Sequence, residues 1–327
     1  MPPRSRPPIE LRSTPLPLAG LKHRVWNSPW VLLVLCNLFW AGNIIVGRVV
    51  LAHVPAVELS FWRWTGAFAF AFWFAWPHLK HDWRVLLQHW KLMLVLAATG
   101  IAFFNTAAYI GLAGTTALNV LLLQSCLPLI VTIWAFALFK ERPGAWQLLG
   151  VALSLLGVAL VAAHGSVDAL LTLRFYSADL WSLGSAVIYG IYVVLLRRRP
   201  DVHPLSFMQA AMGLGACMVA PFYLWDLSLG MHMTNDWGNF VGIGYMAVFP
   251  SFISYLFFNR GVQLIGGARA GQSTHLMPLF GSAMAVLLLS ESLYFYHLAG
   301  AVLVGAGIGL AHFMAPVRSA EDIALGR

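Results

Sequence analysis

The chain has 327 residues, of which 60% are hydrophobic and only 10% are charged, and its formal net charge is +8. Soluble domains carry about 25% charged residues, so this composition excludes an ordinary soluble domain and predicts an integral membrane protein. The basic residues lie in short loops between apolar runs rather than on one face, which argues against binding to nucleic acid.

The first residues, 1–29, are rich in Pro and Arg and predict a disordered cytoplasmic tail. The apolar run after them is too long for the core of a signal peptide, and no small-residue cleavage site follows it. We therefore expect this run to be a retained membrane helix. A second short cytoplasmic tail is expected at 315–327.

Further apolar runs follow along the chain, each near the ~20 residues that a helix needs to cross a bilayer. They predict an all-α membrane protein with ten transmembrane helices, at 30–50, 58–77, 92–112, 117–139, 146–164, 179–196, 204–225, 238–260, 270–289 and 296–314. The motif HDW (81–83) is expected in a cytoplasmic loop. Most Lys and Arg residues fall on one side of this arrangement, which predicts an inner (plasma) membrane protein with both termini in the cytoplasm.

The two halves of the chain resemble each other. LPLIVTIWAFALFKERPGAWQLLG (127–150) aligns with MPLFGSAMAVLLLSESLYFYHLAG (277–300), so that Pro128 matches Pro278. Five helices in each half force the second half to enter the membrane in the opposite sense. This predicts an inverted repeat, typical of secondary transporters with a substrate site near the midplane, with halves at 30–164 and 178–314. A duplication that serves stability alone is the alternative.

The first two predicted helices resemble the sequence patterns of a known family. LFWAGNIIVGR (38–48) is similar to the first-helix pattern of the EamA-type branch of the drug/metabolite transporter superfamily, and LSFWRWTGAF (59–68) to its second-helix pattern. The resemblance covers about residues 30–314 and is greatest to bacterial exporters of aromatic amino acids. It implies a ten-helix transporter of small metabolites.

Two prolines inside apolar runs predict matched helix breaks, because proline cannot donate a backbone hydrogen bond. Pro128 and Pro278 act as the hinge or kink residues, and the polar residues Gln124, Ser125 and His275 stand beside them. Freed carbonyls and polar side chains near the midplane favour a substrate site. A kink whose carbonyl is satisfied by a local hydroxyl is the alternative.

Other polar and aromatic residues recur at helical spacing within the apolar runs. Aromatic faces with a few amides suit an amphipathic organic solute, although such stripes also serve packing. The candidate substrate-binding residues of this kind are Trp40, Asn43, Asn105, Tyr109, Tyr189, Tyr192, Gln209, Tyr255 and Asn259.

Cations are scarce at mid-depth in the predicted helices, which argues against phosphorylated substrates. Arg63 is the best candidate to meet a substrate carboxylate. Pairing of Arg63 with Glu58, or extension of its side chain to the membrane surface, are the alternatives.

No motif of a metalloprotease, a serine hydrolase or a nucleotide-binding loop is present, so we expect no catalytic residue, metal or cofactor. The sequence thus predicts an amino-acid exporter that works by alternating access around a central cavity, with the substrate and the bilayer as partners and a monomer as the assembly. Transport of drugs, quaternary amines or sugars is the first alternative, and a channel or an intramembrane enzyme the next.

Overall fold

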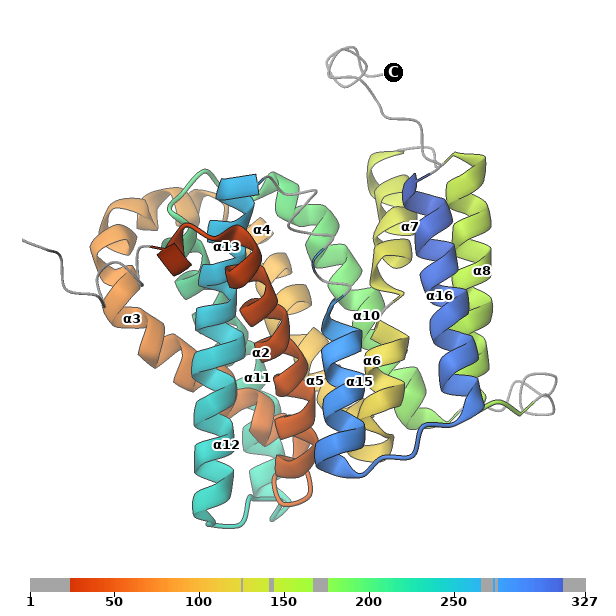
Figure 1. The fold of residues 1–327 in the computed structure, drawn as a ribbon. Helices are drawn as coiled ribbons and strands as arrows, with labels where there is room; N and C mark the ends of the chain where they lie inside the picture. The colour runs from red at the N-terminus through yellow and green to blue at the C-terminus, as the bar shows by residue number, and fades with distance from the viewer. Residues whose placement is uncertain are drawn as a thin grey trace, which may run out of the picture.

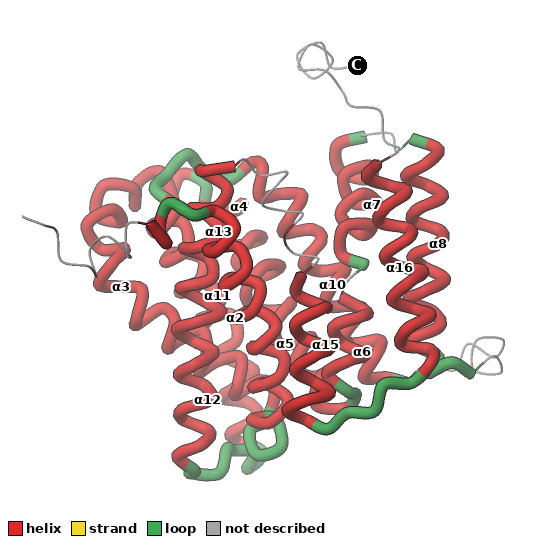
Figure 2. The backbone as a smooth tube through the Cα atoms, viewed as in Figure 1, coloured by secondary structure: helices red, strands yellow, loops and turns green. Residues whose placement is uncertain are grey.

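The computed structural model describes residues 24–124, 126–140, 144–166, 176–265, 273 and 276–313. All regular structure within these residues is helical, as Figure 2 shows. Five helical segments are long and apolar enough to cross a membrane, and a bent pair of helices within 117–139 makes a sixth candidate. The predicted class, an all-helical integral membrane protein, is confirmed.

The described helices follow the apolar runs of the sequence. In the first half of the chain they are α2 (Pro29–Val50), α3 (Ala56–Gln88), α4 (Trp90–Ala97), the π-helical turn η1 (Ala98–Ala102), α5 (Phe103–Gly114), α6 (Ala117–Gln124), α7 (Leu127–Phe139) and α8 (Ala145–Ala162). In the second half they are α10 (Ser177–Leu195), the short 3-10 helix η2 (Leu196–Arg198), α11 (Pro204–Ser228), α12 (Trp237–Val248), the π-helical turn η3 (Phe249–Ile253), α13 (Ser254–Ile265), α15 (Leu276–Leu289) and α16 (Phe295–Phe313).

The halves interlock rather than stand apart. Helix α2 packs against α12, α13 and α15 of the second half, and α10 packs against α5, α6 and α7 of the first half. Figure 1 shows α8 and α16 running side by side at the edge of the molecule. Polar residues on α2, α5 and α10 can therefore meet residues from the other half.

Helix α3 is longer than the sequence predicted. It continues without interruption past Pro77 to Gln88, so the prediction of a loop at 81–83 is wrong. A proline inside a helix costs about 3 kcal/mol. Beyond it, Leu79 packs against the hydrophobic core and Leu86 is buried, and this burial offsets the loss.

Within the described residues, a π-helical turn lies at a matched place in each half. The turn η1 separates α4 from α5, and η3 separates α12 from α13. In η3, Pro250 has no backbone donor, and the hydroxyl of Ser251 donates to the carbonyl of Met246 at 2.8 Å. Such turns are frequent at functional sites because they leave backbone groups and side chains out of the regular helical pattern.

Glycines bring α8 and α16 into close contact. A Cβ atom on Gly157 would lie 2.8 Å from the carbonyl oxygen of Gly300, and one on Gly300 would lie 3.1 Å from that of Gly157. The hydroxyl of Ser154 donates to the carbonyl of Val304 at 3.2 Å. Small residues and a hydroxyl bond of this kind hold helices together where lipid provides no hydrophobic driving force.

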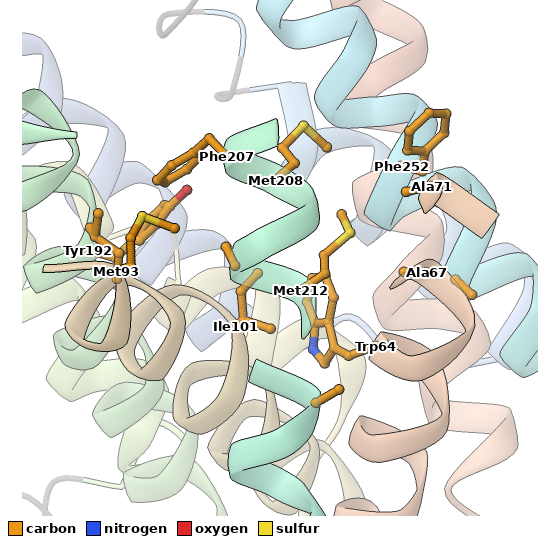
Figure 3. Packing of buried hydrophobic residues seen from close by; sticks show 14 of the residues in the cluster. Trp64, Ala67, Ala71, Met93, Ile101, Tyr192, Phe207, Met208, Met212 and Phe252 are labelled. Carbon is orange, nitrogen blue, oxygen red and sulfur yellow. The ribbon is translucent and has the colours of Figure 1, made fainter. Parts of the chain in front are cut away.

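A hydrophobic cluster fixes α3 against α11 and both π turns. Figure 3 shows Trp64 of α3, Met212 of α11, Ile101 of η1 and Phe252 of η3 among its members. All four are at least 96% buried. Because Trp64 is held there, its neighbour Arg63 is also held inside the helix bundle.

Candidate functional site

Arg63 is the charged residue at the centre of the candidate site. Its side chain is buried, with only 4% of the residue exposed. The Nε atom donates to the Ser251 hydroxyl at 2.8 Å, and Nη1 donates to Asn105 Oδ1 at 2.7 Å and to the Tyr109 hydroxyl. The guanidinium also lies 4.6 Å from the ring centre of Trp64. All of these partners are neutral, so none of them balances the positive charge.

Further hydrogen bonds hold these partners in place. The Tyr109 hydroxyl donates to Asn43 Oδ1 on α2 at 3.1 Å. The Asn105 amide nitrogen donates to the carbonyl of Ile101 at 3.0 Å, which leaves its oxygen facing Arg63. The acceptors around the guanidinium are thus fixed in orientation. We call this set the central cluster: Asn43, Arg63, Asn105, Tyr109 and Ser251.

Arg63 neither pairs with Glu58 nor extends to the membrane surface, the two alternatives that the sequence left open. Glu58 instead accepts a hydrogen bond from the backbone nitrogen of Met233 at 2.7 Å. Within the described residues, the salt bridge closer than 4.0 Å is between His164 and Asp179 and does not involve Arg63. The small exposed fraction of Arg63 also shows that its side chain does not reach the surface.

Four aromatic residues lie near the central cluster or in the hydrophobic cluster beside it. The indole nitrogen of Trp40 donates to the carbonyl of Pro250 at 3.1 Å, directly beside the cluster's serine in η3. The rings of Trp40 and Tyr255 lie 5.9 Å apart, and those of Tyr189 and Tyr192 are stacked at 5.3 Å. Tyr189, Tyr192 and Tyr255 also pack in the hydrophobic cluster that contains Trp64, the neighbour of Arg63. We call Trp40, Tyr189, Tyr192 and Tyr255 the aromatic group.

The remaining amides from the sequence prediction have partners elsewhere. Gln209 donates to a carbonyl of α3 at 3.1 Å, and its buried Oε1 has no partner within the described part of the chain. Asn259 donates to the sulfur of Met208 at 3.8 Å, and Gln124 donates to the hydroxyl of Ser185 at 3.4 Å. None of these bonds reaches the central cluster.

The predicted break at the first proline coincides with a bend. The helices α6 and α7 meet at 40°, and Pro128 is the second residue of α7. Pro278 is the third residue of α15. Ser125 and His275, both predicted to line the site, lie outside the described residues.

A second buried polar network was not predicted. Asp179 Oδ1 accepts from the Thr115 hydroxyl at 2.7 Å, and Oδ2 lies 2.8 Å from His164 Nε2. Asn119 lies 3.1 Å from the Thr115 hydroxyl, 3.0 Å from His164 Nε2 and 3.0 Å from His297 Nε2. We call this set the Asp179 cluster: Thr115, Asn119, His164, Asp179 and His297. It lies where α5, α8, α10 and α16 begin or end, toward the bottom of Figure 1.

The residues that sequence reasoning missed have weak signals. Ser251 is a single hydroxyl beside a proline in an apolar run, and hydropathy does not reveal a π turn. Asp179 had a usable signal, since it is an acidic residue at the start of an apolar run, with His164 and His297 at the ends of two other runs. Within the described residues, no group of three or more His, Cys, Asp or Glu side chains could hold a metal ion.

Comparison with known proteins identifies a family that covers most of the chain. The EamA-like transporter family matches residues 28–163 and again residues 176–313. An uncharacterized transporter, YyaM, of Bacillus subtilis is 31% identical over 66% of this chain and 70% of its own.

Two other relatives have more specific names. A probable amino-acid metabolite efflux pump of Salmonella typhimurium is 29% identical over 88% of this chain and 95% of its own, and one of Escherichia coli is 26% identical over 85% and 92%. A protein of known crystal structure shares the fold, with a TM-score of 0.58 and 17% identity over 88% of this chain and 97% of that one.

Proposed function

Because this chain belongs to the EamA-like transporter family, we propose that it exports small carboxylated metabolites, chiefly amino acids with aromatic or large neutral side chains. Relatives of the family are named transporters and efflux pumps, so the chain is a multi-pass membrane transporter and not an enzyme. The two relatives named as probable amino-acid metabolite efflux pumps support the substrate class.

The observation that carries the proposal is the buried guanidinium of Arg63 with only neutral partners. An ionised side chain inside a membrane protein is costly unless another group pairs with it, so it is a candidate functional residue. A carboxylate would complete this site, because guanidinium and carboxylate form paired, charge-assisted hydrogen bonds. Nη2 of Arg63 has no hydrogen bond to the described residues and is the donor available for it.

The aromatic group supports the choice of side chain. Trp40 lies next to the central cluster through Pro250 and Ser251, and Tyr255 contacts Trp40, so a solute held at Arg63 by its carboxylate can place an apolar side chain against these rings. Offset and edge-to-face ring contacts are worth about 0.5–1.5 kcal/mol each beyond the area that they bury. A doubly charged phosphate would meet a single guanidinium in the central cluster and is a poorer fit.

We infer the transport cycle from the repeat. The family matches each half separately, which supports ten transmembrane helices in two inverted halves, 30–164 and 178–314, with both termini in the cytoplasm and the chain in the inner membrane. The halves would rock about the central cluster and expose it to each side in turn. The π turns η1 and η3 interrupt regular helix in both halves, and this irregular backbone supports the proposal of such a motion.

Counterflow in proteoliposomes tests this proposal. Vesicles are loaded with one unlabelled solute and take up the same labelled solute only if the protein exchanges it. We expect exchange of phenylalanine and leucine, and none of glucose, glucose 6-phosphate or choline, with protein-free vesicles as the control. Exchange of the phosphorylated sugar without the amino acids contradicts the proposal, and ion conductance without exchange favours a channel.

A further inference from the structure

The Asp179 cluster joins the two halves of the chain at one end of the bundle. Thr115, Asn119 and His164 come from the first half, and Asp179 and His297 come from the second. A sixth residue, Glu291, reinforces the junction. Its carboxylate accepts hydrogen bonds from the backbone nitrogens of Ala117 and Leu118 at the start of α6, at 2.8 and 3.0 Å. In the proposed orientation this end faces the outside of the cell.

The hydrogen bonds assign most protons of the Asp179 cluster. His297 Nδ1 accepts from the backbone nitrogen of Tyr294 at 3.0 Å, so Nε2 carries the ring proton and donates to Asn119. The Asn119 amide donates to Thr115, and the Thr115 hydroxyl donates to Asp179. His297 is thereby held as a neutral donor, and protonating its Nδ1 would break its bond to the backbone.

His164 is the member whose side chain reaches solvent. Its side chain is 32% exposed, whereas that of Asp179 is fully buried behind it. Nε2 faces the Asp179 carboxylate, and Nδ1 has no hydrogen bond within the described residues. The ring lies between those of Tyr176 and Tyr296, at 4.3 and 5.9 Å. A carboxylate and two aromatic faces favour a cation at this place.

The other titratable groups around His164 do not compete for this role. Tyr176, Tyr294 and Tyr296 present aromatic rings, and the carboxylate of Glu291 is bound to the start of α6. Arg48, at the neighbouring end of α2, donates to the carbonyls of Leu112 and Ala113, at 2.9 and 3.0 Å. Histidine is the side chain that gains or loses a proton near neutral pH.

We propose that the Asp179 cluster is a proton-binding site that latches the outer ends of the two halves together. In the proposed tautomer Nε2 of His164 donates to the Asp179 carboxylate, and a proton from the outer medium binds Nδ1 and turns this hydrogen bond into an ion pair. Outside acidity then holds the outer side closed, and release of the proton to the same medium permits opening. This inference rests on the proposed transport function and orientation.

Labelling of a cysteine behind the cluster tests the latch. Ser185 on α10 is fully buried and lies six residues, less than two helical turns, beyond Asp179. The protein is expressed with Ser185→Cys and Cys217→Ser, and spheroplasts are treated from outside with an impermeant maleimide. Rates at each pH are divided by those of the same protein carrying His164→Gln, which cancels the pH dependence of the thiol. Glutamine keeps a donor for Asp179 but does not titrate.

We expect the ratio of the labelling rate with His164 to that with His164→Gln to fall roughly fivefold as the outer pH decreases from about 7.5 to 5.5. A partly exposed ion pair that contributes ~1 kcal/mol produces a change of this size. Asp179→Asn should raise the labelling rate and remove the pH response, and His232→Gln, in an exposed outer loop, should leave the response intact. A ratio independent of pH overturns the latch, and so does the absence of labelling in both the parent and Asp179→Asn.

The result separates the two proposals, because labelling needs no substrate. If phenylalanine exchanges and the labelling ratio is flat, only the latch is lost. If the ratio responds to pH and none of the amino acids tested exchanges, the substrate assignment fails and the proton-binding site stands.

Discussion

The central cluster and the Asp179 cluster are both buried polar networks that join the two halves of the chain, but they differ in charge. Arg63 has only neutral partners, whereas the carboxylate of Asp179 has an imidazole 2.8 Å away. A buried charge without a counter-charge is costly, so we proposed that a ligand completes the central cluster, whereas Asp179 already has a partner within the chain. Changes at the first should therefore alter substrate affinity, and changes at the second should alter stability and access.

The largest effect is expected from the loss of the guanidinium. Arg63→Gln should raise the KM for phenylalanine exchange tenfold or more, because hydrogen bonds to charged groups contribute about 1.5–3 kcal/mol. Arg63→Lys keeps the charge but loses the forked donors of the guanidinium. Its KM should lie between those of the unaltered protein and Arg63→Gln. Arg48→Gln is the matched control, since Arg48 binds only backbone carbonyls. Unchanged KM values in both Arg63 variants would place the substrate elsewhere.

The next effect concerns the packing of α8 on α16, whose ends lie at the Asp179 cluster. His164 follows α8, and His297 lies in the first turn of α16. Gly157→Ala would place a Cβ 2.8 Å from the Gly300 carbonyl and separate the helices, at a cost of about 1–3 kcal/mol. A lower Tm in detergent should result, with the KM unchanged.

Gly305→Ala provides the control for this substitution. Gly305 lies on the same α16, and a Cβ there would meet no atom within 4 Å. The Tm should stay the same or rise slightly, because alanine favours a helix over glycine. Equal Tm values for the two variants would contradict the close packing of α8 on α16.

A smaller effect is expected within the central cluster. Tyr109→Phe removes the hydroxyl that accepts from Arg63 and donates to Asn43. The KM should rise about fivefold, the equivalent of a net hydrogen-bond contribution near 1 kcal/mol. Tyr223→Phe is the control, since Tyr223 stacks on Phe61 away from both clusters. A Tyr109→Phe variant that matches Tyr223→Phe in KM would remove this hydroxyl from the site.

The smallest effect lies at the opposite end of the bundle, beyond the membrane-spanning segments. Burial and the neighbouring His78 lower the pKa of His203, whose ring stacks on that of His78 at 3.6 Å. Because the folded pKa is lower than the unfolded one, the unfolded chain binds more protons in between, so this residue reduces stability as the pH falls below about 6.5.

Thermal unfolding as a function of pH checks this sign. The decrease in Tm between about pH 7.5 and 5 should be smaller in His203→Gln than in the parent, and His232→Gln should follow the parent. A larger decrease in His203→Gln would show that protonated His203 stabilises the fold.

Helix positions could be predicted from the sequence because apolar runs of bilayer length have few other structures available. The run 204–225 corresponds to α11, Pro204–Ser228. The end of α3 could not, since a proline and the charged residues after it indicate a boundary. The tertiary packing of Leu79 and Leu86, which the sequence does not show, offsets the cost of the proline in the continued helix.

The central cluster was partly predictable. Asn105 and Tyr109 share a helix face, and Arg63 is a rare cation within an apolar run, so each was visible in the sequence alone. Their meeting depends on α3, α5 and η3 packing together, and Ser251 joins only through the π turn. The Asp179 cluster joins residues up to 178 positions apart, as in the bond between Asn119 and His297, and local patterns cannot reveal such pairs.

The measurement that tests the central claim most directly compares phenylalanine with phenethylamine in counterflow through the unaltered protein. The two solutes share the aromatic ring and the amino group, and only phenylalanine has the carboxylate that Arg63 is proposed to bind. Exchange of phenylalanine should be at least tenfold faster at equal concentration, the consequence of a charged hydrogen bond of about 1.5 kcal/mol or more. Equal exchange of both solutes, or faster exchange of phenethylamine, would contradict the account.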